Sequence, residues 1–247
     1  MRNYAIDINA DVGEGVGNEA QLLPLVSSCN IACGGHAGDE QSMRNTIKLA
    51  IKYEVKIGVH PSYPDKENFG RDSMQITPST LIKSIQSQIS FFKSVCDHEK
   101  AWLHHIKPHG ALYNDIAKNA DIAQVFLKAI LEYKNGAKLY VPYGSVIAQE
   151  ASKEGFSIVY EAFLDRNYNA DLSLVSRQQN NAMLENPTEI MEQLLRIVKN
   201  NQLKTITNEL VKIEAKTFCI HGDSDAAFEI LAYLHSKVSS HQISIKS

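Results

Sequence analysis

The sequence lacks long apolar runs, a strong charge imbalance and a recognisable targeting segment. No stretch of about 18 apolar residues is present, so no membrane-spanning helix is expected. The 25 basic and 28 acidic residues give a formal net charge of −3 without a basic block. This balance argues against nucleic acid or an anionic membrane as a partner. The N-terminal MRNYAIDINADVGEG has no apolar signal core, so we expect a cytoplasmic protein.

Cysteine is scarce, and the standard metal and nucleotide motifs are missing. The four cysteines do not have zinc-knuckle spacing, and we expect buried free thiols in a reducing compartment. There is no HExxH pair, so histidine ligands would have to come from separate segments. There is no GxxxxGK[ST] or GxGxxG loop either. If the protein uses ATP, it does so without a standard nucleotide-binding loop.

Short apolar runs alternate with longer helical patterns throughout the 247 residues, without a linker between domains. This alternation predicts an α/β protein with a parallel sheet, in a single domain over residues 1–247. A short extra strand is expected at 210–214, and the C-terminal HQISIKS is expected to be a frayed tail. The predicted main strands are 4–9, 28–33, 55–59, 102–106, 137–141, 156–161 and 217–220, and the predicted helices are 46–53, 78–92, 120–133, 145–154, 187–198 and 225–238.

Polar side chains follow nearly every predicted strand. Examples are Asp11, His60, the pair Lys107 and His109, and His221. In a parallel barrel the carboxyl ends of all strands meet on one rim, so these groups would converge. An open doubly wound sheet would gather only the few near its switch point. We therefore predict a TIM-like (β/α) barrel of about seven strands, with the open sheet as the alternative.

The stretch NIACGGHAGDE, residues 30–40, carries a histidine and acids on an almost bare backbone. Small residues let backbone N–H groups approach a ligand, and we expect one here. Neutral imidazole and carboxylate are ligands of zinc and similar ions, so Asp11, His36 and His60 are a possible metal set, with His109 or His221 as a further candidate ligand. The same groups could instead act as general acids and bases. Asp39 could also simply cap the helix that follows it.

Several motifs together resemble the LamB/YcsF family. They are NADVGEG, SSCNIACGGHAGD, IGVHPSYPD with NFGR, IKPHGALYN, YEAFLDRNY with LVSR, and FCIHGD, and they extend from Ile6 to Asp223. The resemblance implies a barrel related to sugar and polysaccharide deacetylases. It also implies the role of the A subunit in a cytoplasmic ATP-dependent 5-oxoprolinase, which opens 5-oxoproline to L-glutamate with separate subunits B and C. ATP, with Mg²⁺, is the implied cofactor.

This sequence departs from the family pattern at a few positions. The family usually has Cys at Ala10, Phe at Gly35, Arg at Asp72, Ala at Leu164 and Gly near Leu172. None of these changes removes a histidine or Lys107. The expected catalytic residues are Asp11, His36, His60, Lys107, His109, Glu161, Asp165, His221 and Asp223, and the expected substrate-binding residues are Asn9, Glu14, Asp39, Arg71, Arg166 and Arg177.

The residue types suggest roles in binding anions and transferring protons, but the sequence does not assign each role to a single residue. Lys107 and Arg166 would hold a phosphate or the substrate carboxylate. His60 or His109 would transfer protons, and an acid such as Asp11 would activate water. Two other functions use the same rim. One is a stand-alone metal-dependent amidohydrolase or deacetylase, and the other is a non-catalytic component that binds the small acid.

Overall fold

Seven parallel strands form a closed barrel in the computed structural model, which describes residues 3–222 and 226–246. Each strand pairs with the next, and the last strand, β9, pairs with both β6 and β1. The predicted TIM-like barrel is therefore confirmed, and the open sheet is not what forms. The barrel strands are β1 (Tyr4–Val12), β2 (Ser28–Ala32), β3 (Lys56–His60), β4 (Leu103–Ile106), β5 (Lys138–Pro142), β6 (Ile158–Phe163) and β9 (Thr217–Ile220).

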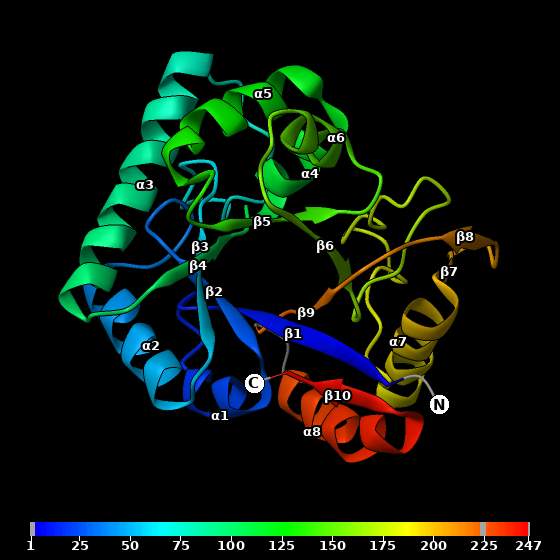
Figure 1. Ribbon diagram of the computed structural model, residues 1–247. Helices are drawn as coiled ribbons and strands as arrows, with labels where there is room; N and C mark the ends of the chain where they lie inside the picture. The colour runs from blue at the N-terminus through cyan, green and yellow to red at the C-terminus, as the bar shows by residue number, and fades with distance from the viewer. Residues whose placement is uncertain (1–2, 223–225, 247) are drawn as a thin grey trace.

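Helices surround the barrel and cover its outer surface (Figure 1). Local sequence explains where they begin: Thr77 accepts a hydrogen bond from the backbone N–H of Thr80, and Pro78 occupies the first turn that follows. The helices are α1 (Glu19–Leu22), α2 (Glu40–Lys52), α3 (Pro78–His98), α4 (Gly110–Lys118), α5 (Ala120–Ala129), α6 (Val146–Lys153), α7 (Pro187–Asn200) and α8 (Ala227–Lys237), with 3-10 turns η1 (Leu23–Leu25), η2 (Leu131–Tyr133) and η3 (Val238–His241).

Alternation along β1 shows how the barrel is built. Ile6 and Ile8 are buried in the apolar core, as expected for side chains that point outward beneath the helices. Asp7 between them and Asn9 after them carry polar side chains, and Asn9 is fully buried. Asn9 reaches Thr217 of β9 at 2.7 Å and accepts a hydrogen bond from Asn30 of β2 at 2.7 Å. The interior of the barrel is therefore a polar network, and its apolar core lies between the strands and the helices.

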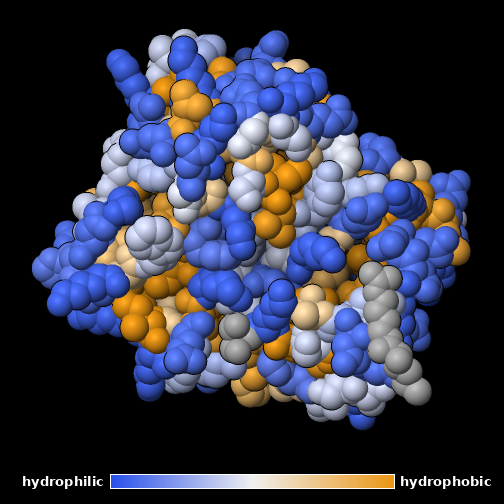
Figure 2. Space-filling view, viewed as in Figure 1, coloured by the Kyte–Doolittle hydropathy of each residue, from blue (hydrophilic) through white to orange (hydrophobic). Residues whose placement is uncertain are grey.

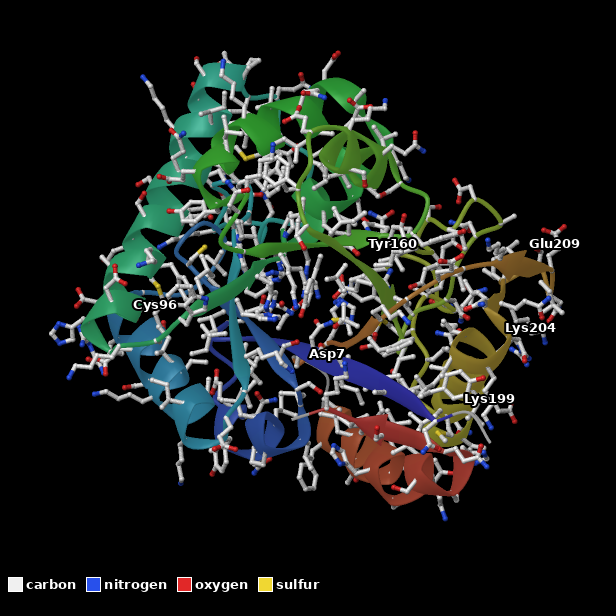
Figure 3. All side chains as sticks on the ribbon, in the orientation of Figure 1. Asp7, Cys96, Tyr160, Lys199, Lys204 and Glu209 are labelled. Atoms are coloured by element: carbon white, nitrogen blue, oxygen red, sulfur yellow. The ribbon has the colours of Figure 1, made fainter. Side chains whose placement is uncertain are left out.

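The polar interior is closely packed. His105 of β4 lies 2.7 Å from Asn30 Oδ1, and its ring stacks on Tyr140 with the centroids 4.0 Å apart. A Cβ atom at Gly58 would lie 2.1 Å from this imidazole, which explains the glycine in β3. Figure 3 shows nitrogen- and oxygen-bearing side chains gathered within the ring of strands, whereas the labelled Lys199, Lys204 and Glu209 lie on the outer side.

Of two predictions about the chain beyond the barrel, one needs correction and the other is confirmed. The C-terminal segment is not a frayed tail: Ile243–Ile245 forms β10 and pairs in parallel with the start of β1, and Ile243 is buried. The extra strand expected at 210–214 is β8 (Leu210–Lys212), which forms an antiparallel hairpin with β7 (Gln202–Lys204) outside the barrel. Helix α4 and the short α1 were not predicted, and both lie directly after barrel strands or their loops.

The polar surface, the cysteines and the helices agree with the expectations drawn from composition. The face seen in Figure 2 is mostly hydrophilic, with smaller groups of apolar side chains. All four cysteines are buried free thiols, as predicted. Among the described residues, no helix combines the length and apolar character needed to cross a membrane.

Candidate functional site

A cleft of about 520 Å³ lies at the carboxyl ends of the barrel strands. This size is within the usual range for small-molecule sites. The segment after β6 borders the cleft through residues 174–178. Of the predicted site residues, those lining the cleft are Asp11, Glu14, His60, Arg71, Lys107, His109, Arg166, Arg177 and His221.

The floor of the cleft is a buried ion cluster around Lys107. Its ammonium nitrogen lies 2.9 Å from Asp11 Oδ1, 3.0 Å from Glu161 Oε1 and 3.0 Å from Cys219 Sγ. Asn9 completes the cluster by donating to Glu161 Oε1 at 2.9 Å. Lys107 is 1% exposed, so water does not screen these pairs. Lys107 neutralises the protein's own carboxylates and does not point freely at a substrate anion.

Burial and charge oppose each other in this cluster. Burial alone would raise the pKa of Asp11, but His60 and Lys107 beside it hold that pKa well below its usual value. Burial would likewise lower the pKa of Lys107, but Asp11 holds it well above its usual value. The pair is therefore ionised at neutral pH. Burial raises the pKa of the Cys219 thiol well above its usual value, which keeps the thiol protonated.

A second group, which we call the histidine cluster, consists of Glu14, His36, His60 and His109. One nitrogen or oxygen from each side chain lies within 4.8 Å of those of the other three. Glu14 Oε1 is 2.9 Å from His36 Nε2 and 3.4 Å from His109 Nδ1. His109 Nδ1 is 3.0 Å from His60 Nε2, and the rings of His36 and His109 stack 3.6 Å apart. Burial holds the pKa of His36 below its usual value and that of His109 well below it.

Two glycines let the loop after β3 pack on the histidine cluster. Gly70 has φ +62°, and a Cβ atom there would lie 3.0 Å from His36 Cβ. Gly110 has φ +55°, and its Cβ would lie 2.4 Å from the carbonyl oxygen of Gly70. Both positions therefore favour glycine on grounds of backbone conformation and space. The loop then places the carbonyl of Phe69 3.0 Å from His109 Nε2.

A separate carboxylate–imidazole pair lies on the other side of the cleft. Asp165, just after β6, accepts hydrogen bonds from the backbone N–H of His221 at 2.8 Å and from its Nδ1 at 2.9 Å. We assign the proton to Nδ1, which leaves Nε2 able to accept one. Burial would raise the pKa of Asp165, but His221 lowers it below its usual value. This arrangement is that of a general base oriented by a carboxylate.

The predicted substrate-binding residues divide into different environments. Arg71 and Arg177 are exposed and line the cleft. Arg166 is buried, and its guanidinium donates to the carbonyls of Val175 and Ala182, so it holds the loop after β6 in place. Asp39 is exposed and forms a capping box with Ser42 at the start of α2, away from the residues that line the cleft. The predicted Asp223 lies outside the described residues.

The glycine-rich stretch at residues 30–40 contacts other parts of the protein. A Cβ atom at Gly35 would lie 2.4 Å from both Gln88 Oε1 and Ser62 Oγ. Gln88 itself bonds to the backbone N–H and carbonyl of Ser62, at 3.0 and 2.9 Å. The space beside Gly35, where the family usually has Phe, is therefore filled by a glutamine from α3. The bare backbone makes room for neighbouring protein atoms, while His36 alone from this stretch joins the cluster.

Sequence reasoning missed Tyr113, which lies in the motif KPHGALYN. Its hydroxyl is buried and, within the described residues, has no hydrogen-bond partner; the same is true of Glu161 Oε2 and His36 Nδ1. Burial, with Glu161 nearby, holds the pKa of Tyr113 well above its usual value, so the hydroxyl stays a donor. Unpaired buried polar atoms are uncommon, and here they lie in or beside one cleft. The signal that could have found Tyr113 was its place on the first turn of a helix that starts at the rim.

Known proteins are similar in sequence to this chain over nearly its whole length. The model of the LamB/YcsF family matches residues 6–247. A protein of Haemophilus influenzae strain PittEE, named as the A subunit of 5-oxoprolinase, is 39% identical over 240 residues, covering 97% of this chain and 98% of its own. The protein of that name from strain PittGG matches at the same identity over the same length.

A solved structure agrees with the sequence matches. The lactam utilization protein from Thermus thermophilus superposes with a TM-score of 0.89 at 31% identity, over 98% of this chain and 99% of that one. A truncated 3-deoxy-D-arabino-heptulosonate 7-phosphate synthase from Thermotoga maritima, with a TM-score of 0.50 at 9% identity, shares the fold alone. The predicted relation to deacetylases stays a prediction. The chain belongs to the LamB/YcsF family.

Proposed function

We propose that this chain is the A subunit of a 5-oxoprolinase, a hydrolase that opens the lactam ring of 5-oxoproline to give L-glutamate. The names of its Haemophilus influenzae relatives and of the Thermus thermophilus lactam utilization protein support this activity. The observation that carries the proposal to this chain is the His221–Asp165 pair beside a cleft bordered by Arg71 and Arg177. A site that opens the cyclic amide of a small carboxylic acid needs a cation to bind the carboxylate and a group that transfers protons to the ring nitrogen.

The cleft offers a distinct contact for each part of such a substrate. Arg71 and Arg177 would hold its carboxylate, because guanidinium groups pair with carboxylates through two parallel hydrogen bonds. Tyr113 would donate a hydrogen bond from its buried hydroxyl to the lactam oxygen and so orient the carbonyl group. His221 would take a proton from water and return one to the ring nitrogen as the C–N bond breaks. Asp165 would hold the imidazole in the required tautomer.

ATP and two partner subunits are part of the proposal. A lactam is a stable amide, and transfer of the γ-phosphoryl group to its oxygen, with release of ADP, would make the carbonyl carbon reactive. Water would then add to that carbon and the C–N bond would break, which leaves an acyl phosphate and a free amine. A second water would hydrolyse the acyl phosphate to L-glutamate and phosphate. Because the chain has no standard nucleotide loop, ATP with Mg²⁺ would bind here against the arginines of the cleft or on a partner. The name of the relatives implies other subunits, and we propose subunits B and C.

The proposed location is the cytoplasm. All four cysteines are unpaired thiols in the structure, as is usual for proteins kept in a reducing compartment.

Glutamate release from labelled 5-oxoproline tests the proposal. The assay compares this chain alone with its mixture with subunits B and C, each with and without ATP. Release only in the complete mixture with ATP is the expected result. Release by the chain alone without ATP would show a stand-alone amidohydrolase, and the histidine cluster makes that the main alternative. Substrate binding with no release in any mixture would show a protein that binds the small acid without catalysis.

A further inference from the structure

The histidine cluster presents two imidazole nitrogens to each other with no proton available between them. His60 Nδ1 lies 2.7 Å from the carbonyl oxygen of Lys107, and His109 Nε2 lies 3.0 Å from that of Phe69. A carbonyl only accepts hydrogen bonds, so each of these nitrogens carries the ring's N–H. When both rings are neutral, the opposite nitrogens, His60 Nε2 and His109 Nδ1, both carry lone pairs. They lie 3.0 Å apart, where two lone pairs repel unless a cation lies beside both.

The separations between donor atoms match a coordination shell. Zinc–nitrogen and zinc–oxygen bonds of about 2.0–2.1 Å in a tetrahedron place neighbouring ligand atoms about 3.3 Å apart. In the histidine cluster, Glu14 Oε1 is 2.9 Å from His36 Nε2, 3.4 Å from His109 Nδ1 and 3.9 Å from His60 Nε2. The four donor atoms lie within 4.8 Å of one another and come from four separate segments of the chain. His60 and His109 border the cleft from which an ion would enter.

Formal charge around the cluster also favours a divalent cation. Three carboxylates, from Asp11, Glu14 and Glu161, are no more than 7% exposed. Within the described part of the chain, the one buried ammonium beside them is that of Lys107, which pairs with Asp11 and Glu161. With neutral imidazoles this leaves a formal charge of −2 in a buried region. Uncompensated buried charge is costly, and a divalent cation beside Glu14 and Asp11 would balance it.

We propose that the histidine cluster binds one first-row divalent cation, best matched by Zn²⁺, through Glu14, His36, His60 and His109. Two backbone carbonyls act as outer partners that fix the ring orientation of His60 and His109, as is usual for metal-bound histidines. Glu14 takes the place expected for Asp11, because Asp11 Oδ1 is already bonded to Lys107 and Asn30. Among the described residues, nothing bonds to His36 Nδ1, so loss of His36 should weaken cation binding less.

This site goes beyond the proposed function and is tested without substrate, ATP or partner subunits. The full chain, free of any polyhistidine tag and stripped with a chelator, is titrated with Co²⁺ while its visible d–d absorption is recorded, and Zn²⁺ is then added in competition. The expected result is one Co²⁺ per chain, displaced by one Zn²⁺. His60→Gln and His109→Gln should each weaken binding by more than about 100-fold. His235→Gln, on the exposed face of α8, is the matched control and should bind as the wild type does.

Several outcomes would overturn the site. Wild-type protein that takes up no Co²⁺ and no Zn²⁺ would show that the two facing imidazoles share a proton instead. Binding that survives His109→Gln unchanged would place the cation elsewhere. If the histidine variants fail to fold by circular dichroism, Glu14→Gln in the loop after β1 replaces them. It should lose about 10-fold in affinity, and an unchanged affinity would contradict the proposal. A bound cation without glutamate release would contradict the proposed function only.

Discussion

The ammonium of Lys107 lies 2.9 Å from Asp11 Oδ1 and 3.0 Å from Glu161 Oε1, in a region closed to water. This lysine was expected to hold a substrate anion, and its geometry shows that it balances the charge of the barrel floor. Without it, Asp11 and Glu161 would lose the ammonium that they share in a buried region. The lysine therefore matters first for the folded state.

Lys107→Met should lower the free energy of unfolding by about 3–5 kcal/mol, the usual result of removing one partner from a buried ion pair. Urea denaturation followed by circular dichroism measures the change. Lys118→Met is a matched control, because Lys118 borders the same cleft but is exposed. It should change the free energy of unfolding by less than about 0.5 kcal/mol. Equal stability of the two variants would show that Lys107 is not the counter-ion described here.

Arg177→Met should raise the KM for 5-oxoproline by about 10-fold or more, because it removes a charged hydrogen bond worth about 1.5–3 kcal/mol. Its effect on kcat should be smaller, since the carboxylate is held equally before and during ring opening. Initial rates in the complete mixture, measured over a range of substrate concentrations, give both constants. Arg44→Met removes an arginine of α2 that pairs with Glu40 and with Glu99 after α3, and it should leave both constants unchanged. An unchanged KM in Arg177→Met would assign the carboxylate to another group.

Gly58→Ala should destabilise the barrel by about 1–3 kcal/mol through overpacking, because the new methyl group would press on the ring of His105. Gly136→Ala is the matched control: a Cβ atom there meets nothing within 4 Å. Its free energy of unfolding should stay within about 0.5 kcal/mol of the wild-type value. Thermal unfolding of the two variants side by side makes the comparison. Equal stability would mean that the barrel interior is less tightly packed than the structure shows.

Burial of His105 predicts a stability that falls in acid. Burial holds the pKa of His105 well below its usual value of 6.5 in the folded state. The unfolded chain therefore binds the extra proton first, and stability declines as pH falls below about 6.5. In metal-free buffer, His105→Gln should reduce the slope of unfolding free energy against pH by up to about 1.4 kcal/mol per unit between about pH 6 and 5.

Tyr140→Phe is the control for this titration. It removes the hydroxyl from the ring stacked on His105 but no group that titrates near this pH, so it should keep the wild-type slope. Chemical denaturation at a series of pH values provides the slopes. Identical slopes for wild type and His105→Gln would show that the pKa of His105 is the same in the folded and unfolded chains.

Local sequence patterns were enough to predict the barrel and the residues on its rim. Nearly every strand ends in a polar motif, as at His60 and Lys107, and parallel strands bring their carboxyl ends together. The partners on the rim could not be predicted, because they lie far apart in the chain: Lys107 and Cys219 are 112 positions apart. The strand at Ile243–Ile245 was missed because its three residues are too short for a periodic signal, and its pairing with β1 comes from the other end of the chain.

The most direct test of the account is glutamate release by His221→Gln in the complete mixture with ATP. The assignment of His221 as the proton-transfer group predicts a loss of about 100-fold or more in kcat, with folding unchanged by circular dichroism. His98→Gln, at the exposed end of α3, should match the wild type. A His221→Gln variant that releases glutamate at the wild-type rate would contradict the claim that the lactam is opened beside the His221–Asp165 pair.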